Sequence, residues 1–157
     1  MKKTLKLTES QLQQLIKRKL REQEEEGIEF DVEETTENSN MDLLASHLLF
    51  SQTQAHVFHL QTGSYAEHKA LQGFYEGIDG LADSLIESYQ GENENIMNYQ
   101  TFDLIKYDGK EVVIKYFEDL MRIVDENREG LPSHLQNIID TVNELITSTL
   151  YKLRKLS

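Results

Sequence analysis

Four long stretches of this chain carry apolar residues at the three- and four-residue spacing of a helix, and this pattern constrains the fold more than any other feature. They lie at about 39–61, 65–90, 110–127 and 133–153. The only proline of the chain, Pro132, directly precedes the last stretch. The sequence therefore predicts an all-α protein.

The connections between these helices predict their arrangement. A tight turn at Gly63–Ser64 joins the first pair and a short turn joins the last pair, while the polar segment 91–109 separates the two pairs. Two antiparallel pairs linked by one long crossover are typical of a ferritin-like four-helix bundle. We therefore expect residues 39–157 to form a ferritin-like four-helix bundle with one long crossover. Ser64 with Glu67, and Ser133 with Gln136, have the spacing of capping boxes, and Gly91 is expected to end the second helix.

The helix at 39–61 is apolar around much of its circumference, which predicts burial on more than one side. This pattern predicts self-association as a dimer or a larger shell. Its apolar residues include Met41, Leu44, Ala45, Leu48, Phe50, Ala55 and Phe58.

The segment 102–116 allows two interpretations. Asp108–Gly109 between two apolar runs is a signature of a β-hairpin turn. However, Val113, Phe117 and Leu120 keep helical spacing beyond that turn, which favours a helix from about Lys110 to Asn127.

The N-terminal part differs in composition from the rest. Residues 1–26 are predicted to form a basic amphipathic helix, appended to the bundle through an acidic linker at 27–38. Residues 1–21 carry seven Lys and Arg against one Glu, whereas residues 22–37 carry nine acidic residues and no basic one. Such a segment predicts a protein partner for residues 1–26.

Composition excludes several classes of function. The absence of cysteine rules out disulfides, thiolate metal sites and a cysteine nucleophile. The net charge of −12 argues against binding of nucleic acid or anionic membranes. Neither a membrane span nor a secretory signal is recognisable, so a cytoplasmic protein is expected.

Histidines and carboxylates form the one constellation that points to chemistry. Two histidines stand twelve residues apart on either side of the predicted turn, and two carboxylates follow fifteen and nineteen residues after the second. Imidazole and carboxylate together bind iron, and manganese and zinc are alternatives. The predicted metal ligands are His56, His68, Asp83 and Glu87.

Three further residues share these faces as reserve ligands: His59, Asp79 and Gln72. The alternative interpretation is a solvated polar stripe, and no Glu-x-x-His pair of the usual di-iron bundle is present. The other two histidines, His47 and His134, are expected to be surface or capping residues.

The segment from Ala55 to Glu87 resembles the mini-ferritins known as Dps, DNA-binding proteins from starved cells. His56, His68, Asp83 and Glu87 match that family's ligand spacing without gaps, and the last helix is also similar, so that the resemblance covers about residues 41–155. It implies a bundle that pairs into dimers, with a ferroxidase site made of two histidines from one chain and the carboxylates from the other.

The match has departures. Gln72 stands where the family has an iron-binding Asp, and Val57-Phe58 replaces the Trp-Asn that follows the first histidine. The segment from Leu5 to Ile16 looks like short leader helices on proteins of tailed phages. Two functions are therefore expected: a Dps-like protein that binds iron and oxidises Fe(II), or a non-catalytic ferritin-like structural or interaction protein, in the host cytoplasm or in a virion if it is encoded by a phage.

Overall fold

The structure is a computed structural model that describes residues 40–156, and these residues form four helices and no strand. The helices are α2 (Asn40–Gln61), α3 (Tyr65–Asn93), α4 (Lys110–Glu126) and α5 (Ser133–Lys155). The all-α prediction is confirmed. The amphipathic helix predicted within residues 1–26 and the linker at 27–38 lie outside the described residues.

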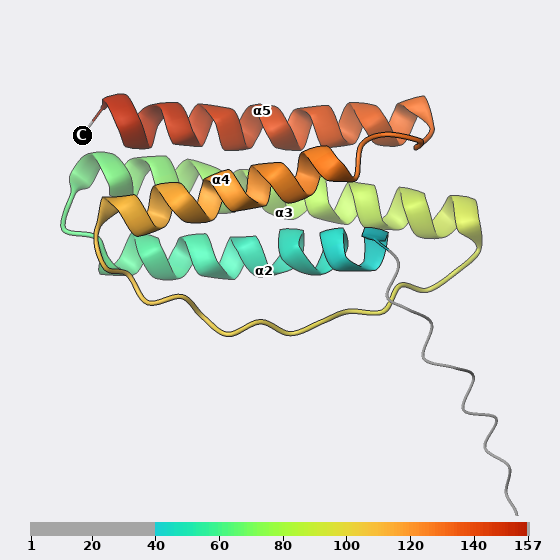
Figure 1. Ribbon diagram of the computed structural model, residues 1–157, viewed down its shortest axis with the longest axis horizontal. Coiled ribbons are helices and arrows are strands. Elements are labelled where there is room, and N and C mark those ends of the chain that lie inside the picture. Colours follow the sequence, from blue (N-terminus) through green and yellow to red (C-terminus); the bar gives the residue numbers. More distant parts are fainter. Residues whose placement is uncertain (1–39, 157) are drawn as a thin grey trace, which may run out of the picture. The chain divides into compact units, whose positions relative to one another are not determined.

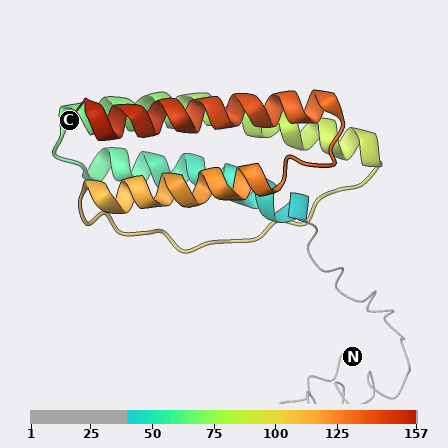
Figure 2. The ribbon, with the colours of Figure 1, turned by 45° about the horizontal axis from the view of Figure 1, so that its top comes forward.

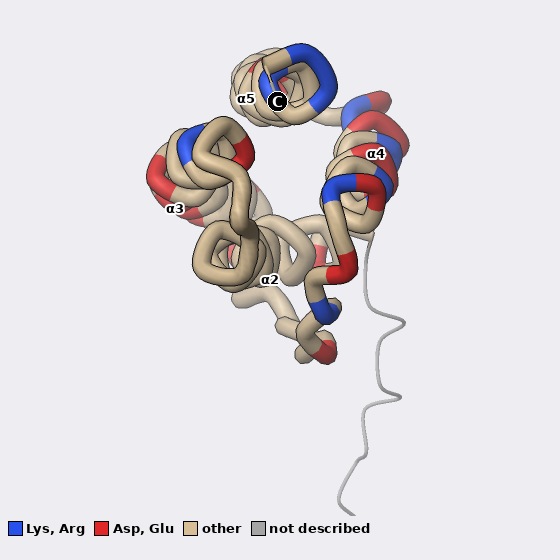
Figure 3. The backbone as a smooth tube through the Cα atoms, turned by 90° about the vertical axis from the view of Figure 1, so that its left-hand side faces the viewer, with Lys and Arg blue, Asp and Glu red and all other residues tan. Residues whose placement is uncertain are grey.

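The helices surround one apolar core in the order α2, α3, α5 and α4 (Figures 1 and 3). Contacts are dense between α2 and α3, between α3 and α5 and between α4 and α5, but sparse between α2 and α4. Each pair that is consecutive in the chain, α2–α3 and α4–α5, is antiparallel (Figure 1). The bundle is therefore least tightly closed along the α2–α4 side.

The core follows the helical stripes of the sequence. Its largest fully buried aromatic side chains are Phe58, Phe74 and Phe117, and the ring centroids of Phe74 and Phe117 lie 4.7 Å apart at 77°. Burial of such side chains stabilises the fold by about 1.5–3 kcal/mol each. Among the described residues, no helix is long and apolar enough to cross a lipid bilayer.

The crossover (residues 94–109) runs the length of the bundle beside α2 (Figures 1 and 2). It has no regular secondary structure, so its backbone groups need other partners. Polar side chains of α2 provide several of them. Asp42 Oδ1 accepts from the backbone N–H of Asn98 at 3.3 Å, and Ser46 Oγ accepts from that of Gln100 at 2.9 Å.

The predicted burial of α2 on more than one side is confirmed, but its cause is within the chain. One side of α2 packs on the core, and polar residues on another lie under the crossover, where Asp42, Ser46 and Gln54 are all buried. Self-association is therefore not required to cover these sides of α2, and it stays a prediction.

The favoured interpretation of the segment 102–116 is confirmed, because α4 begins at Lys110, directly after Gly109 with its φ of 94°, and the hairpin alternative is excluded.

Two local predictions about helix ends are wrong. Gly91 lies inside α3, which continues to Asn93 and ends at Glu94 in the left-handed region. Pro132, not Ser133, occupies the N-cap of α5, and the side chain of Gln136 donates to the carbonyl of Leu131 instead of closing a capping box.

Candidate functional site

Three histidines gather where α2 and α3 meet at the Gly63–Ser64 turn. The rings of His59 and His68 stack with centroids 3.6 Å apart and an interplanar angle of 26°. His56, one turn earlier on α2, lies 5.8 Å from the His59 ring and stacks on Tyr75 at 4.5 Å. The predicted imidazole cluster is present, but His59, predicted as a reserve ligand, is the direct neighbour of His68.

The two stacked histidines are held by reciprocal hydrogen bonds. His59 Nδ1 donates to the backbone carbonyl of His68 at 2.9 Å, and His68 Nδ1 donates to that of His59 at 3.1 Å. A carbonyl oxygen can only accept, so each Nδ1 must carry the hydrogen. In the neutral rings this leaves both Nε2 atoms as the free lone pairs, the tautomer that a metal-bound histidine adopts.

The buried carboxylate of Glu67 forms further hydrogen bonds at the same turn. Glu67 is buried, and its Oε2 accepts from the hydroxyl of Thr62 at 2.6 Å and from that of Tyr107 at 3.0 Å. Ser64 accepts from the Glu67 backbone N–H at 3.4 Å, so only half of the predicted capping box forms. The Glu67 carboxylate thus joins the crossover to the α2–α3 turn at the residue next to His68.

The predicted carboxylate ligands lie elsewhere on α3. Asp79, Asp83 and Glu87 are all exposed. Because a helix rises 1.5 Å per residue, Asp83 is displaced from His68 by about 22 Å and Glu87 by about 28 Å. Within one chain these groups do not meet, and the described residues contain no cluster of three side chains able to hold a metal ion.

Gln72, at the position of the missing carboxylate, is one helical turn from His68. Its side-chain oxygen accepts from Lys69 Nζ at 2.5 Å, and its amide donates to Glu76 Oε1 at 2.8 Å. These bonds are exposed, and they match the solvated polar stripe that was the alternative interpretation. The imidazole cluster and the carboxylate stripe are therefore two separate features of a single chain.

Sequence reasoning missed one residue of this cluster. Tyr75 packs against His56 and points an edge at His59 at 5.2 Å, a contact that helical spacing from His68 would have indicated.

The other two histidines lie outside the cluster. His134 is exposed, as expected for a surface residue, and lies 3.4 Å from a carboxylate oxygen of Glu92. His47 is partly buried and is not a free surface residue, because its ring stacks on Phe102 at 4.3 Å. No local signal in the sequence predicts either contact.

Comparison with known proteins gives a family but no activity. No curated protein and no solved structure matches the chain. The sequence profile of a family of unknown function, DUF5856, matches residues 59–153, a segment that contains His59, His68 and all of the α3 carboxylates. This match covers more than half of the chain, and the protein therefore belongs to the family of unknown function DUF5856.

Proposed function

We propose that this chain is a ferritin-like bundle that binds a divalent transition metal, iron foremost, at a site shared between two copies. The observation that carries the proposal is the reciprocal bonding of His59 and His68, which places the hydrogen of each ring on Nδ1 and leaves the Nε2 lone pair as the possible metal ligand. The helix order and the single long crossover are those of ferritin-like folds, which supports the assignment.

A second copy is needed because of the separation along α3. Two α3 helices related by a two-fold axis near Glu76 and Gly77 would set His68 of one copy opposite Asp83 and Glu87 of the other. The surface of α3 around Gly80 leaves room for the α3 helix of a second copy, since a Cβ added at Gly80 would meet nothing within 4 Å. The outer stripe of α2 is also apolar, with Leu49 and Leu60 exposed by 43% and 70% on either side of His56.

Charge favours a metal in this arrangement. Four acidic residues lie along the exposed side of α3: Glu76, Asp79, Asp83 and Glu87. Two such stripes repel each other when they approach, and a divalent cation between them would offset that repulsion. Metal binding and association of two copies should therefore be coupled.

The ligand set would be His56 or His59 with His68 from one copy, completed by Asp83 and Glu87 from the other. The donors fit Fe(II) and, less selectively, Mn(II) or Zn(II). Gln72 would contribute an uncharged oxygen where the Dps-like pattern has a carboxylate. The ligand set would therefore carry one negative charge fewer and bind the metal more weakly. Asp79, one helical turn before Asp83, is the reserve carboxylate. Such a site would support oxidation of bound Fe(II) to Fe(III), with the electron passing to an external oxidant such as dioxygen or hydrogen peroxide.

The test is an anaerobic thermal melt combined with sedimentation, with and without Fe(II). A site of this kind stabilises the folded protein by about 2.7 kcal/mol at a hundredfold excess over the dissociation constant, and the sedimenting mass should double with metal. The double variant His68→Ala, Glu87→Ala should lose both effects, while Gln72→Asp should increase both. The surface variant Asp140→Asn, on α5, is the matched control. Unchanged melting and mass in both wild type and Gln72→Asp would refute the proposal.

One observation favours the second candidate, a non-catalytic structural or interaction protein. In a single chain the His59–His68 pair already has a structural role, because its two hydrogen bonds join the end of α2 to the start of α3. This candidate predicts that His68→Ala lowers the melting temperature equally with and without metal. Its partner would be bound by residues 1–26, in the cytoplasm or in a virion.

A further inference from the structure

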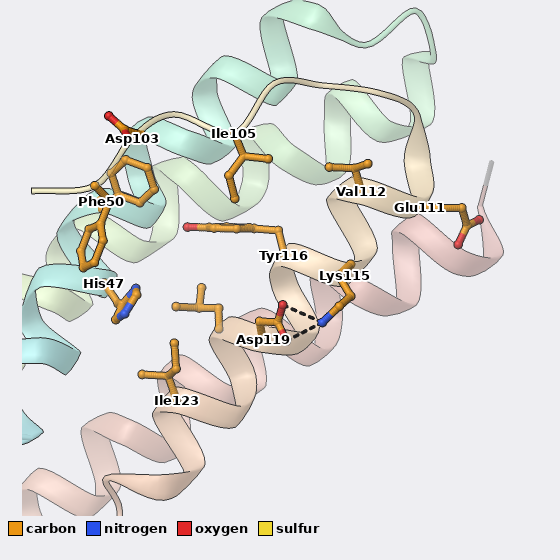
Figure 4. Close-up of a pocket in the computed structure, with 12 residues that line it drawn as sticks. His47, Phe50, Asp103, Ile105, Glu111, Val112, Lys115, Tyr116, Asp119 and Ile123 are labelled. Carbon is orange, nitrogen blue, oxygen red and sulfur yellow. Dashed lines mark hydrogen bonds and ion pairs between the residues drawn. The ribbon is translucent and has the colours of Figure 1, made fainter.

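A cavity of about 600 Å³ opens on the sparsely packed side of the bundle, between α2, the crossover and α4 (Figure 4). Its volume is within the range of small-molecule sites. Its apolar lining includes Phe50, Phe102, Ile105, Tyr116 and Ile123. The cavity shares no residue with the imidazole cluster, and its interpretation does not depend on the metal proposal.

The Tyr116 hydroxyl is the feature that points to a ligand. In Figure 4 the phenol extends from α4 across the cavity toward Phe50 and His47 on α2. Its hydroxyl oxygen is buried and has no hydrogen-bond partner, and burial raises the pKa of Tyr116 far above its ordinary value. A buried, unpartnered hydroxyl costs about 1–3 kcal/mol of stability, so a ligand that bonds to it gains that difference.

Aromatic rings make up one wall of the cavity. His47 stacks on Phe102 with an interplanar angle of 20°, and Phe50 packs on the same ring at 5.3 Å. Burial lowers the pKa of His47, so the imidazole is neutral at pH 7 and adds to the apolar wall. Flat, uncharged ring faces of this kind favour an aromatic ligand.

Charge at the mouth limits the ligand further. Three carboxylates, of Asp103, Glu111 and Asp119, line the cavity with a single cation, Lys115. That ammonium group is already bound to both oxygens of Asp119, at 2.7 and 2.8 Å. The remaining negative charge disfavours anionic ligands such as fatty acids, and favours neutral or cationic ones.

We infer that this cavity is a binding site for a neutral or cationic aromatic small molecule that forms a hydrogen bond with the Tyr116 hydroxyl. The lining, the unpartnered phenol and the acidic mouth each select one property of that ligand: its ring system, its polar group and its charge.

A matched pair of fluorescent probes tests the charge and the ring system on the full-length chain. N-phenyl-1-naphthylamine is neutral and carries one N–H donor, whereas 8-anilino-1-naphthalenesulfonate has the same aromatic body with an added sulfonate. The neutral probe should bind with a stoichiometry of one per chain. The anionic probe should bind about threefold or more weakly, and added salt should reduce the difference by screening.

Variants test the position. Tyr116→Phe should lower the affinity for the neutral probe about fivefold, which is the effect of losing one hydrogen bond. Ile105→Trp, at a side chain that points into the cavity in Figure 4, should abolish binding by filling the space. Val112→Trp, from α4, is a second filling variant if the first does not fold. Tyr151→Phe is the control, because Tyr151 lines a separate cavity of about 260 Å³ next to α5.

Three results would overturn the inference. The first is equal binding by wild type and both filling variants. The second is a loss of probe binding in Tyr151→Phe while Tyr116→Phe binds the probe as tightly as wild type does. That result would place the probe in the smaller cavity. The third is binding that rises as the protein is diluted, which would mean that a second copy of the chain covers the cavity.

Discussion

The side-chain amide of Gln54 pairs with both backbone groups of Ile105. Gln54 Nε2 donates to the Ile105 carbonyl at 3.0 Å, and the Ile105 N–H donates to Gln54 Oε1 at 2.8 Å. Gln54 is fully buried at 0% exposure, although it lies on a helix whose other buried side chains are mostly apolar. This pair fixes the middle of the crossover to α2 and sets the wall of the cavity that Ile105 lines.

The first prediction concerns this pair. Gln54→Leu removes two hydrogen bonds and leaves the backbone N–H and carbonyl of Ile105 unpaired. The free energy of unfolding should therefore fall by about 2–3 kcal/mol. Gln61→Leu is the matched control, because it removes one exposed bond, to the Tyr107 N–H at 3.2 Å, and should cost under about 1 kcal/mol. Urea denaturation measures both. Equal losses would mean that burial of the pair contributes nothing.

The second prediction compares two tyrosine hydroxyls. Tyr107 donates to the buried carboxylate of Glu67, so Tyr107→Phe should cost about 1.5–3 kcal/mol. The Tyr116 hydroxyl has no partner, so Tyr116→Phe should be neutral or stabilising in the absence of ligand. The melting temperature should therefore fall in Tyr107→Phe and stay unchanged or rise in Tyr116→Phe. A clear loss in Tyr116→Phe would show that its hydroxyl has a partner in solution.

The third prediction concerns pH. Burial lowers the pKa of His47 below its ordinary 6.5, so below that pH the unfolded chain binds a proton that the folded chain does not. The folded state therefore loses stability as pH falls below about 6.5. His47→Phe keeps a ring against Phe102 and removes this loss, so its melting temperature should fall less than that of wild type between pH 7.5 and 5.5.

The control for this comparison is Thr141→Ala, since Thr141 is exposed on α5 away from the cavity and its side chain does not titrate. Its pH profile should follow that of wild type more closely than the His47→Phe profile does. Parallel profiles for wild type and His47→Phe would contradict the prediction.

The fourth prediction uses two glycines of α3. A Cβ at Gly80 would meet nothing within 4 Å, so Gly80→Ala should stabilise the protein by about 0.5–1 kcal/mol through helix propensity. A Cβ at Gly77 would lie 3.2 Å from Leu145 Cδ2 on α5, closer than an ordinary contact. Gly77→Ala should therefore gain less or lose stability, and differential scanning calorimetry of the pair measures the difference. A larger gain at position 77 would mean that Leu145 moves aside without cost.

The sequence by itself determined the helices, because their signals are local. Apolar spacing, the Gly63–Ser64 turn and Pro132 placed α2, α4 and α5 within about two residues of their observed ends. Gly91 failed as a stop signal, since one exposed glycine costs a long helix only about 1 kcal/mol, which packing of α3 against its neighbours exceeds.

The candidate site was predictable only in part. The spacing of the histidines around the turn indicated that imidazoles would gather there, and they do. Which two would pair was not predictable, because the choice of His59 over His56 depends on backbone carbonyls that the turn brings within reach of each ring. The distance of Asp83 from these rings follows from helix rise alone, so any joint site needs a second chain.

Only the tertiary structure decided the surroundings of α2. From the sequence, Gln54 and Ser46 are polar residues of a helix, and His47 is a lone histidine. The crossover, about fifty residues later in the chain, supplies the backbone groups that satisfy Gln54 and Ser46 and the Phe102 ring that covers His47. Hydrogen bonds and ring contacts between distant segments leave no periodic trace in a sequence, so the buried polar side of α2 and the cavity beside it emerge only when the chain is folded.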